Sequence, residues 1–324
     1  MGAHPRPTGN PIVKLPLLRW QMRRFRRSAR AIPAGAALTG LVIAVALLLG
    51  DSLQAWHLHL QTLRIGRLRS ALDGGDRFFR AEAADRLAPH TVAPLLQVHG
   101  AIEAPDHAAY AVDARILGVD ARFWRFSPGG RPPVGFERQG VYINTLLAQR
   151  LNVDIGDDIL IRADAEPAGL AEMQLRFAPA SPKILRRKVS GLLTPDQFSR
   201  FNLHQDDRAL PLLILPLADA QSFLQQPHKA NLLLSDSPDL PDLNARFRTG
   251  FSLEDAEARV EAVLEMDEWE IRSRRVFLEP PIGRAAAQAG LQAEGILAYF
   301  VNGITASSHT VPYSLVAALP PSRL

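Results

Sequence analysis

The stretch AIPAGAALTGLVIAVALLLG, residues 31–50, contains twenty consecutive residues without a charge. A helix of this length rises about 30 Å, which matches the hydrocarbon thickness of a bilayer. Nine of its side chains are Leu, Ile or Val, which favour insertion into lipid. Pro33 and Gly50 lie near the ends, where they disturb a helix least. The stretch therefore predicts a transmembrane helix over residues 31–50.

The charges on either side of this segment predict its orientation. Residues 1–30 contain eight Lys or Arg and no acidic residue, whereas Asp51 follows the segment directly. Because positively charged flanks stay in the cytoplasm, we expect a cytoplasmic N-terminus and an extracytoplasmic location for everything after residue 50. Within the basic segment, residues 17–30 show apolar side chains at helical spacing. Two interpretations stay open for them: a basic amphipathic helix on the cytoplasmic leaflet, or a disordered tail.

A cleaved secretory signal is the alternative interpretation of a basic region followed by an apolar run. The basic region here is about thirty residues long, and the apolar run exceeds the roughly 7–15 residues of a signal peptide. No small-x-small cleavage site follows, since Leu53 occupies the −3 position before Ala55. These features favour a retained membrane anchor.

The distribution of charge along the chain does not favour a general nucleic-acid-binding surface. Although the chain of 324 residues has a formal net charge of +4, the first 30 residues carry eight of its 37 Lys and Arg and none of its 33 acidic residues. The remainder therefore has 29 basic and 33 acidic side chains, and no nucleic-acid partner is expected. The chain has no cysteine, which excludes disulfides, thiolate catalysis and cysteine-ligated metal sites.

Beyond the anchor, the pattern predicts a stalk and then a folded domain. Apolar residues recur every three or four positions after the anchor, which predicts a stalk helix over residues 51–73 that ends at Gly74 and Gly75. Residues 74–324 alternate short β-like and helical patterns, so we expect an α+β domain with a soft boundary near residues 236–250. The expected strands are residues 92–101, 110–119, 157–163, 183–193, 229–235, 270–279, 295–303 and 312–318. The expected helices are residues 141–151, 217–225, 254–265 and 283–291.

A second membrane span is not expected. Residues 295–322 carry no charge, but the polar residues in their middle predict two strands joined by a turn. Residues 209–218 are apolar but too short to span a bilayer, and two prolines interrupt them, so they are expected to form a buried strand or loop.

The sequence contains no motif that indicates catalysis. It lacks a P-loop, a dinucleotide-binding glycine pattern, a nucleophile elbow and a His-Glu-x-x-His motif, so we expect no enzyme activity and assign no catalytic, cofactor-binding or metal-binding residue. His57 and His59 are two positions apart, which turns them about 200° from each other on a helix and makes them a poor metal pair.

Two clusters of charge are candidate binding sites, one for lipid headgroups and one for a cation. The basic cluster contains Lys183, Arg186, Arg187 and Lys188, and the acidic cluster contains Glu265, Asp267, Glu268 and Glu270. Neither has a defined ligand geometry, so a solvated surface is the favoured interpretation of both.

Several short segments, taken in order, resemble one family. They are residues 66–79 (GRLRSALDGGDRFF), 116–120 (ILGVD), 123–124 (FW), 141–144 (VYIN) with Leu151, 156–158 (GDD), 231–234 (NLLL), 273–278 (SRRVFL) and 312–314 (PYS). Together with the basic flank and the anchor, they resemble the FtsX-like and MacB-like ABC transporter permeases of bacteria.

The resemblance implies a MacB-like extracytoplasmic core domain behind a first helix in the bacterial inner membrane. It also implies later membrane helices that engage a cytoplasmic ABC ATPase, and the export or extraction of a lipid, lipoprotein, peptide or drug. The sequence fits the first part of such a permease, so we expect a truncated or split form. Its expected partners are the ATPase, membrane lipids, and other permease helices or a second copy, without a cofactor. The alternatives are a single-pass anchored binding or scaffold protein without energy coupling and, less favoured, an anchored hydrolase.

Overall fold

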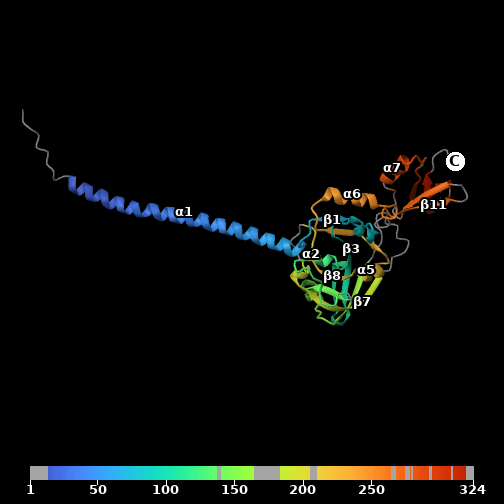
Figure 1. The fold of residues 1–324 in the computed structure, drawn as a ribbon, viewed down its shortest axis with the longest axis horizontal. Helices are drawn as coiled ribbons and strands as arrows, with labels where there is room; N and C mark the ends of the chain where they lie inside the picture. Colours follow the sequence, from blue (N-terminus) through green and yellow to red (C-terminus); the bar gives the residue numbers. More distant parts are fainter. Residues whose placement is uncertain are drawn as a thin grey trace, which may run out of the picture.

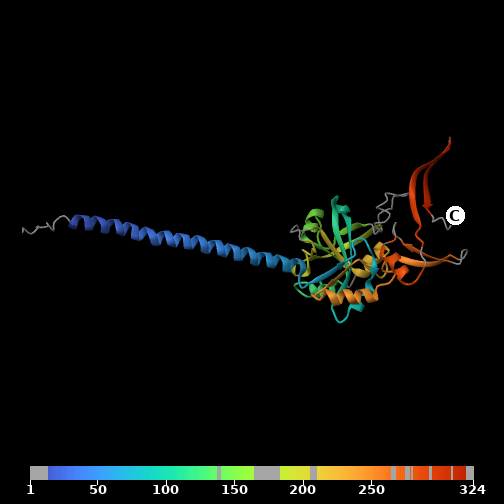
Figure 2. The ribbon, with the colours of Figure 1, turned by 90° about the horizontal axis from the view of Figure 1, so that it is seen from above.

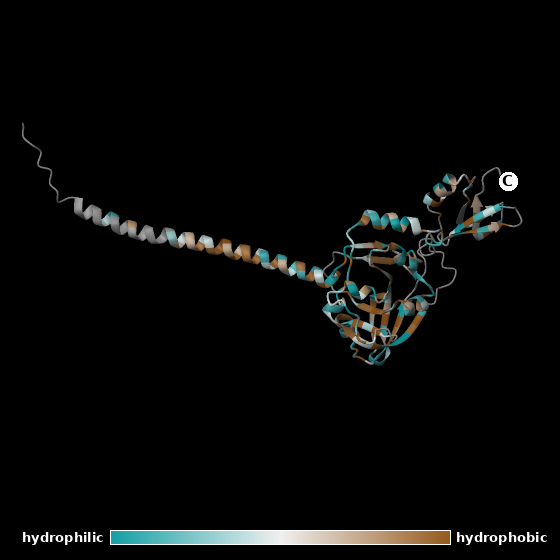
Figure 3. Ribbon diagram, viewed as in Figure 1, coloured by the Kyte–Doolittle hydropathy of each residue, from teal (hydrophilic) through white to brown (hydrophobic). Residues whose placement is uncertain are grey.

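A single long helix, α1 (Lys14–Ile65), leads into a body of strands and short helices (Figure 1). The computed structural model describes residues 14–136, 140–163, 183–204, 210–263, 268–273, 278, 280–291, 294–307 and 309–318. The 52 residues of α1 extend about 78 Å at 1.5 Å per residue. Its apolar part is long enough to cross a membrane, by length and composition, and Figure 3 shows hydrophobic residues concentrated along the middle of the helix.

The body contains both strands and helices, which confirms the predicted α+β class. The further helices are α2 (Phe123–Phe126), α3 (Thr145–Leu151), α5 (Leu217–Leu224), α6 (Leu240–Gly250) and α7 (Pro280–Gln288), with 3-10 helices η2 (Ala81–Leu87), η3 (Pro105–His107) and η4 (Pro195–Gln197). The strands are β1 (Ser70–Asp73), β2 (Phe79–Arg80), β3 (Val92–Ala104), β4 (Ala109–Val119), β5 (Val141–Asn144), β6 (Asp158–Ala163), β7 (Lys183–Leu193), β8 (Leu212–Pro216), β9 (Lys229–Ala230), β10 (Leu232–Ser235), β11 (Ala258–Val263), β12 (Glu268–Ser273), β13 (Leu297–Ala306) and β14 (His309–Ala318).

The largest sheet closes on itself. Its strands follow the order β1, β10, β3, β4, β8, β5, β7, β6, and β6 pairs back onto β3, so the last six strands form a ring. Within the ring, β4 runs parallel to β8 and β5 runs parallel to β7, whereas the other neighbours are antiparallel. A closed ring leaves few open strand edges, which protects the sheet against pairing with other chains.

Asn231 completes the edge of β3 that two strands share. β10 pairs with residues 92–95 of β3, and β6 pairs with residues 100–103, so neither strand reaches Gln97 on that edge. The side chain of Asn231 serves Gln97 instead: Oδ1 accepts a hydrogen bond from the backbone N–H at 2.7 Å, and Nδ2 donates to the carbonyl at 2.7 Å. The amide thus supplies the donor and acceptor of a missing strand residue.

Two hydrophobic cores cover the two faces of the ring strands. One core contains side chains of α3 and α5, and the other contains α2 and the segment around Phe198. In β8, Leu213 and Leu215 belong to the first core, whereas Leu212 and Ile214 belong to the second. A strand that is buried on both faces carries an uninterrupted apolar run, which explains the buried strand expected within residues 209–218.

The predicted stalk helix is shorter than expected. The residues beyond the anchor were predicted to be helical over 51–73, but α1 ends at Ile65 and residues 70–73 form β1. The apolar side chain of Leu68 is 6% exposed because it is packed in the body. Apolar spacing alone does not separate a helix stripe from the core residues that follow it. Gly74 and Gly75 form the turn after β1 and do not end the helix.

Two further helix predictions need correction. Residues 141–151 begin as strand β5, and α3 starts only after Asn144, whose Oδ1 accepts the backbone N–H of Leu147 at 3.0 Å. Residues 254–265 contain strand β11 instead of a helix, since Val260 and Ala262 pair with residues of β12. The soft boundary near residues 236–250 contains helix α6, which packs against η2.

The one strand expected over residues 229–235 is observed as two strands, β9 and β10, which belong to different sheets. The other predicted elements are found, with small shifts of their ends. Residues 17–30, for which a helix and a disordered tail were both left open, lie within α1. The strand expected over 270–279 is observed as β12, and residues 274–277 and 279 lie outside the described part of the chain. The two strands expected within residues 295–322 are β13 and β14, and Figure 2 shows this ribbon projecting from the body.

Candidate functional site at the foot of the long helix

The chain leaves α1 through a tight left-handed turn at Gly66. Its φ is +55°, a region that side chains disfavour, and its N–H still donates to the carbonyl of Thr62 at 2.8 Å. A Cβ at this position would lie 2.1 Å from the carbonyl oxygen of Phe126 and 3.0 Å from the ring of Phe198. Both the backbone angle and the available space therefore require glycine where the helix meets the body.

We call residues 65–69, where α1 ends and the body begins, the foot of the helix. Main-chain hydrogen bonds join this foot to two elements of the body. The N–H of Arg67 donates to the carbonyl of Phe126, at the end of α2, at 2.8 Å. The N–H of Arg69 donates to the carbonyl of Ser235, at the end of β10, at 2.9 Å. β1 follows at once and pairs with β10, so four residues after the turn the chain is already part of the sheet.

A group of aromatic side chains belongs to the core against which this foot packs. We call it the aromatic cluster, and its members are Phe123, Trp124, Phe136, Tyr142, Phe198 and Phe201. The ring centroid of Phe123 lies 5.2 Å from Trp124 and 5.0 Å from Phe198, distances typical of favourable aromatic pairs. Ile65 and Leu68 pack against the same core. The end of α1 and the residue Leu68 after it thus pack against a buried aromatic core.

The aromatic cluster is also tied to the ring strands. Tyr142 belongs to β5, and its hydroxyl donates to the carbonyl of Val134 at 2.7 Å. Two residues on, Nδ2 of Asn144 donates to the carbonyl of Ser199 at 3.1 Å and to that of Leu210 at 2.8 Å. These contacts connect the aromatic cluster to β5 and to the segments that flank η4 and β8.

A cluster of polar side chains, which we call the joint, connects the segment after α6 to strand β2. It consists of Arg80, Ser252 and Asp255. Asp255 is 4% exposed, and its carboxylate accepts hydrogen bonds from the backbone N–H of Arg80 at 2.9 Å and from its Nη2 at 2.6 Å. The N–H of Ser252 donates to the same carboxylate at 2.9 Å. Burial by itself raises the pKa of Asp255, but the hydrogen bonds from Arg80 and Ser252 outweigh it and lower the pKa from 3.8 to about 2.

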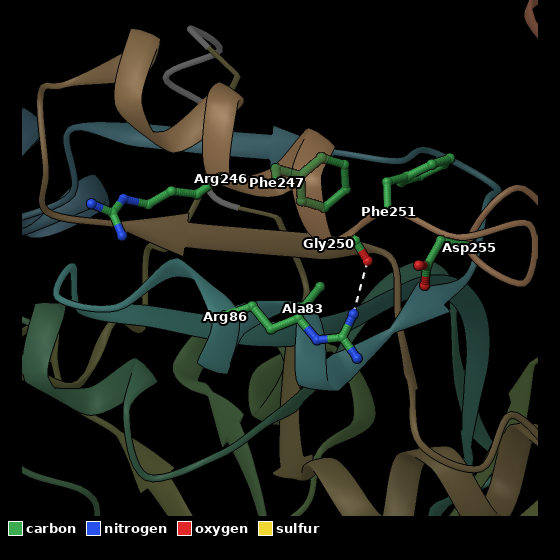
Figure 4. Close-up of a pocket in the computed structure, with 7 residues that line it drawn as sticks. All are labelled: Ala83, Arg86, Arg246, Phe247, Gly250, Phe251 and Asp255. Atoms are coloured by element: carbon green, nitrogen blue, oxygen red, sulfur yellow. Dashed lines mark hydrogen bonds between the residues drawn. The ribbon is translucent and has the colours of Figure 1, made fainter.

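A small pocket lies beside this joint (Figure 4). It is lined by Ala83, Arg86, Arg246, Phe247, Gly250, Phe251 and Asp255. Nη1 of Arg86 donates across it to the carbonyl of Gly250 at 2.8 Å. The volume of this pocket is about 10 Å³, which is room for about one water molecule. The pocket is thus a gap in a structural joint and too small for an organic ligand.

Comparisons with known proteins identify similar outer domains. No family model matches the chain, and no curated protein does. Among solved structures, the chain is similar to the extracellular domain of the noncanonic ABC-type transporter YknZ from Gram-positive bacteria, with 10% identity and a TM-score of 0.35 over 60% of this chain and 90% of that one. It is also similar to the periplasmic region of MacB from Actinobacillus actinomycetemcomitans, with 10% identity and a TM-score of 0.34 over 71% of this chain and 96% of that one. Both lie outside the cytoplasm. The second is a MacB, the type of protein that the sequence resembles.

The structure places the predicted basic cluster on β7, where its members are engaged. Arg186 and Lys188 both approach Oδ2 of Asp158 on the neighbouring strand, at 3.1 and 3.4 Å. Nζ of Lys183 donates to the carbonyl of Leu224 at 3.0 Å, and Arg187 donates to the carbonyl of Arg186 at 3.1 Å. The favoured interpretation as a solvated surface agrees with these contacts.

The predicted acidic cluster and the histidine pair do not form a described site. Glu265 and Asp267 lie outside the described residues, and Glu270 pairs with Nε of Arg272 at 2.8 Å. His59 contacts the ring of Trp56, with 6.0 Å between centroids. Within the described ranges, no group of three or more His, Asp or Glu side chains could hold a metal ion.

Sequence reasoning missed the residues that form the foot and the joint. Gly66 directly follows the regular apolar spacing of α1, which is the signal for a helix C-terminus, and it would have located the end of the helix. Arg80 and Asp255 gave no such signal, since 175 positions separate them in the sequence.

Proposed function

We propose that this chain is the membrane-anchored, extracytoplasmic part of an ABC transporter permease. In this role it would couple a separate cytoplasmic ATPase to the export or extraction of a lipid, lipoprotein, peptide or drug. One observation carries the proposal. α1 is a single continuous helix that contains basic residues, then an apolar stretch of membrane length, and its last residues pack against the core of the body. The sequence resemblance to FtsX-like and MacB-like permeases supports the assignment of this helix to an ABC transporter.

The foot is suited to transmit movement. A flexible linker between anchor and body would absorb a displacement of the helix, whereas here one glycine separates α1 from hydrogen bonds to α2 and β10. The aromatic cluster packs against the same point, and close-packed interiors transmit strain because they have little free volume. A tilt or rotation of α1 would then be carried into the strands of the ring.

The proposed role is mechanical and not catalytic. The Asp255 joint has the geometry of a structural clamp, because its carboxylate is fully engaged by Arg80 and Ser252. We propose accordingly that the cargo meets an outer surface of the body, while chemical energy enters from the ATPase through the membrane.

The first test concerns the placement of α1 in the membrane. The chain has no cysteine, so single-cysteine variants report topology without background. In intact bacterial cells, a membrane-impermeant maleimide should label Gln61→Cys, whereas Ser28→Cys should react only after permeabilisation. Labelling of Ser28→Cys from outside, or a mature chain that lacks its first fifty residues, would refute the proposal.

The second test concerns the ATPase. The tagged full chain, purified from its native membrane in a mild detergent, should carry an ATP-hydrolysing subunit whose activity is sensitive to vanadate, and an untagged chain on the same resin should carry none. Recovery of the chain without ATP hydrolysis, under conditions that keep other ABC complexes intact, would favour the anchored binding or scaffold protein.

A further inference from the structure

Strand β4 carries a buried arginine that is bonded to neutral oxygen atoms. Arg115 is 4% exposed, and its Nη1 donates to the carbonyl of Phe201 and to Oδ1 of Asn202, both at 3.2 Å. Its Nε is buried and has no hydrogen-bond partner among the described residues. In the part of the chain that the structure describes, no Asp or Glu side chain accepts a hydrogen bond from this guanidinium.

Other arginines of the body are compensated by carboxylates. Arg80 lies 2.6 Å from Asp255, and Arg122 lies 2.6 Å from Asp120. Hydrogen bonds between charged groups are usually about 2.7–2.9 Å long, so the contacts of Arg115 at 3.2 Å are weak by comparison. Burial lowers the pKa of Arg115, but an arginine side chain stays protonated in proteins. A buried cation is unfavourable unless a negative group compensates it.

Asp113 offsets this charge in part and is itself engaged elsewhere. Its negative charge raises the pKa of Arg115, against the larger effect of burial. However, its Oδ1 lies 2.8 Å from Nδ1 of His99, and its side chain is 77% exposed. Asp113 therefore acts on Arg115 through space and leaves the buried donor at Nε unused.

Arg115 lies where the second core meets solvent. Leu117, two positions further on the same face of β4, belongs to that core. On the neighbouring strand, His99 pairs directly with Arg115, so the two side chains share one face of the sheet. The side chain of His99 is 54% exposed. An ion from solvent can thus approach the buried guanidinium beside His99.

We propose that Arg115 is the centre of a binding site for an oxyanion, the phosphate or carboxylate group of a ligand. The edge of a guanidinium that contains Nε and Nη2 matches the two oxygens of such a group, and the hydrogen bonds of Nη1 hold the fork in place. Because Nε is covered, the ligand has to displace the segment around Asn202 slightly. The site does not depend on the membrane placement of α1 or on an ATPase.

Titration calorimetry of the full chain in detergent tests the site. The probe is inorganic phosphate, with sodium chloride at equal ionic strength as the reference, and we expect saturable binding of one phosphate per chain. Arg115→Met should lower the association constant at least about tenfold, because it removes the charge and the donors but keeps an unbranched apolar side chain. Arg150→Met removes an exposed arginine of α3, which packs in the first core, and should bind phosphate as the parent does.

Two further variants keep the test valid if Arg115→Met does not fold. Arg115→Lys retains the charge but loses the fork, so its phosphate affinity should also fall. Asp113→Asn removes a competing negative charge, and asparagine tolerates the φ of +56° at this position, so its phosphate affinity should rise about twofold. Parallel titrations with glycerol phosphate and with acetate show whether a phosphate or a carboxylate is the preferred group.

Three outcomes would overturn the site. The first is a parent chain without saturable phosphate binding. The second is equal phosphate affinity in the parent, Arg115→Met and Arg115→Lys. The third is an Asp113→Asn variant that loses stability and gains no affinity, because Asp113 would then be the counter-ion of Arg115.

Discussion

Substitution of Gly66 by alanine tests the grip of the body on the long helix. At φ +55° an alanine costs about 1–2 kcal/mol for the left-handed backbone alone. Its Cβ would also lie 2.1 Å from the carbonyl oxygen of Phe126, so that carbonyl has to move by more than an ångström. The movement breaks its hydrogen bond with the N–H of Arg67, worth about 0.5–1.5 kcal/mol. We expect Gly66→Ala to lower the free energy of unfolding by about 1.5–3.5 kcal/mol, the sum of these two contributions.

Gly75 provides a matched control for this substitution. Its φ is +59°, nearly the same as that of Gly66, but no atom lies within 4 Å of the position that a Cβ would take. Gly75→Ala therefore costs the backbone term alone, about 1–2 kcal/mol. The difference between the two variants isolates the close contact at the foot.

The assay is urea unfolding of the full chain in detergent, followed by near-ultraviolet circular dichroism of the aromatic cluster. Hydrogen exchange read by mass spectrometry should show, for Gly66→Ala only, faster exchange of the amide of Arg67. Equal losses of stability in Gly66→Ala and Gly75→Ala, with unchanged exchange at Arg67, would refute the close contact between the helix foot and α2.

Three further predictions concern the joint, the shared edge of β3 and the helix α5. The pKa of Asp255 is about 2 in the folded protein against 3.8 ordinarily, so its contribution of about 2 kcal/mol is present above pH 4 and is lost as the pH falls from 4 towards 2. Asp255→Asn should thus be less stable than the parent at pH 7, with the gap narrowing towards pH 2 in thermal unfolding; a gap that does not change with pH contradicts this. Asn231→Asp keeps the acceptor for the N–H of Gln97 but places a carboxylate oxygen against the carbonyl of Gln97. It should lower the free energy of unfolding by about 1–3 kcal/mol and speed amide hydrogen exchange in β3. An unchanged free energy of unfolding would show that the amide is not needed there. Gly118→Ala places a Cβ 2.3 Å from that of Ala220, so α5 must shift and stability should fall by about 1–3 kcal/mol in urea unfolding, whereas unchanged stability would contradict the close packing of α5 on β4.

The predictions from sequence were most successful for helices and strands that can be recognised from their own consecutive residues. β3, β4, β6 and β7 were all expected within a few residues of their observed bounds, because each is a short β-like run bounded by turn signals. The strand β11 was predicted as a helix, since its apolar residues in isolation fit both periods. Only the pairing of Val260 with Ile271 and of Ala262 with Trp269 decides for a strand.

The candidate site was hidden from the sequence for a related reason. The foot depends on Gly66 meeting Phe126 and Phe198, which lie 60 and 132 positions further along the chain, and no local pattern reports such a contact. The charge clusters that a local search does find, such as Arg186 and Lys188, are occupied by ordinary cross-strand ion pairs.

The membrane-length helix and its basic flank could be predicted from the amino-acid order, because insertion into a bilayer depends mainly on the composition of consecutive residues. The α+β class of the remainder could be predicted as well. The end of the helix, the closure of the strands into a ring and the buried contacts of Arg80 with Asp255 could not be predicted in this way. Those outcomes depend on close contacts and hydrogen bonds between residues as far apart as Arg80 and Asp255, and such contacts exist only after the chain has folded.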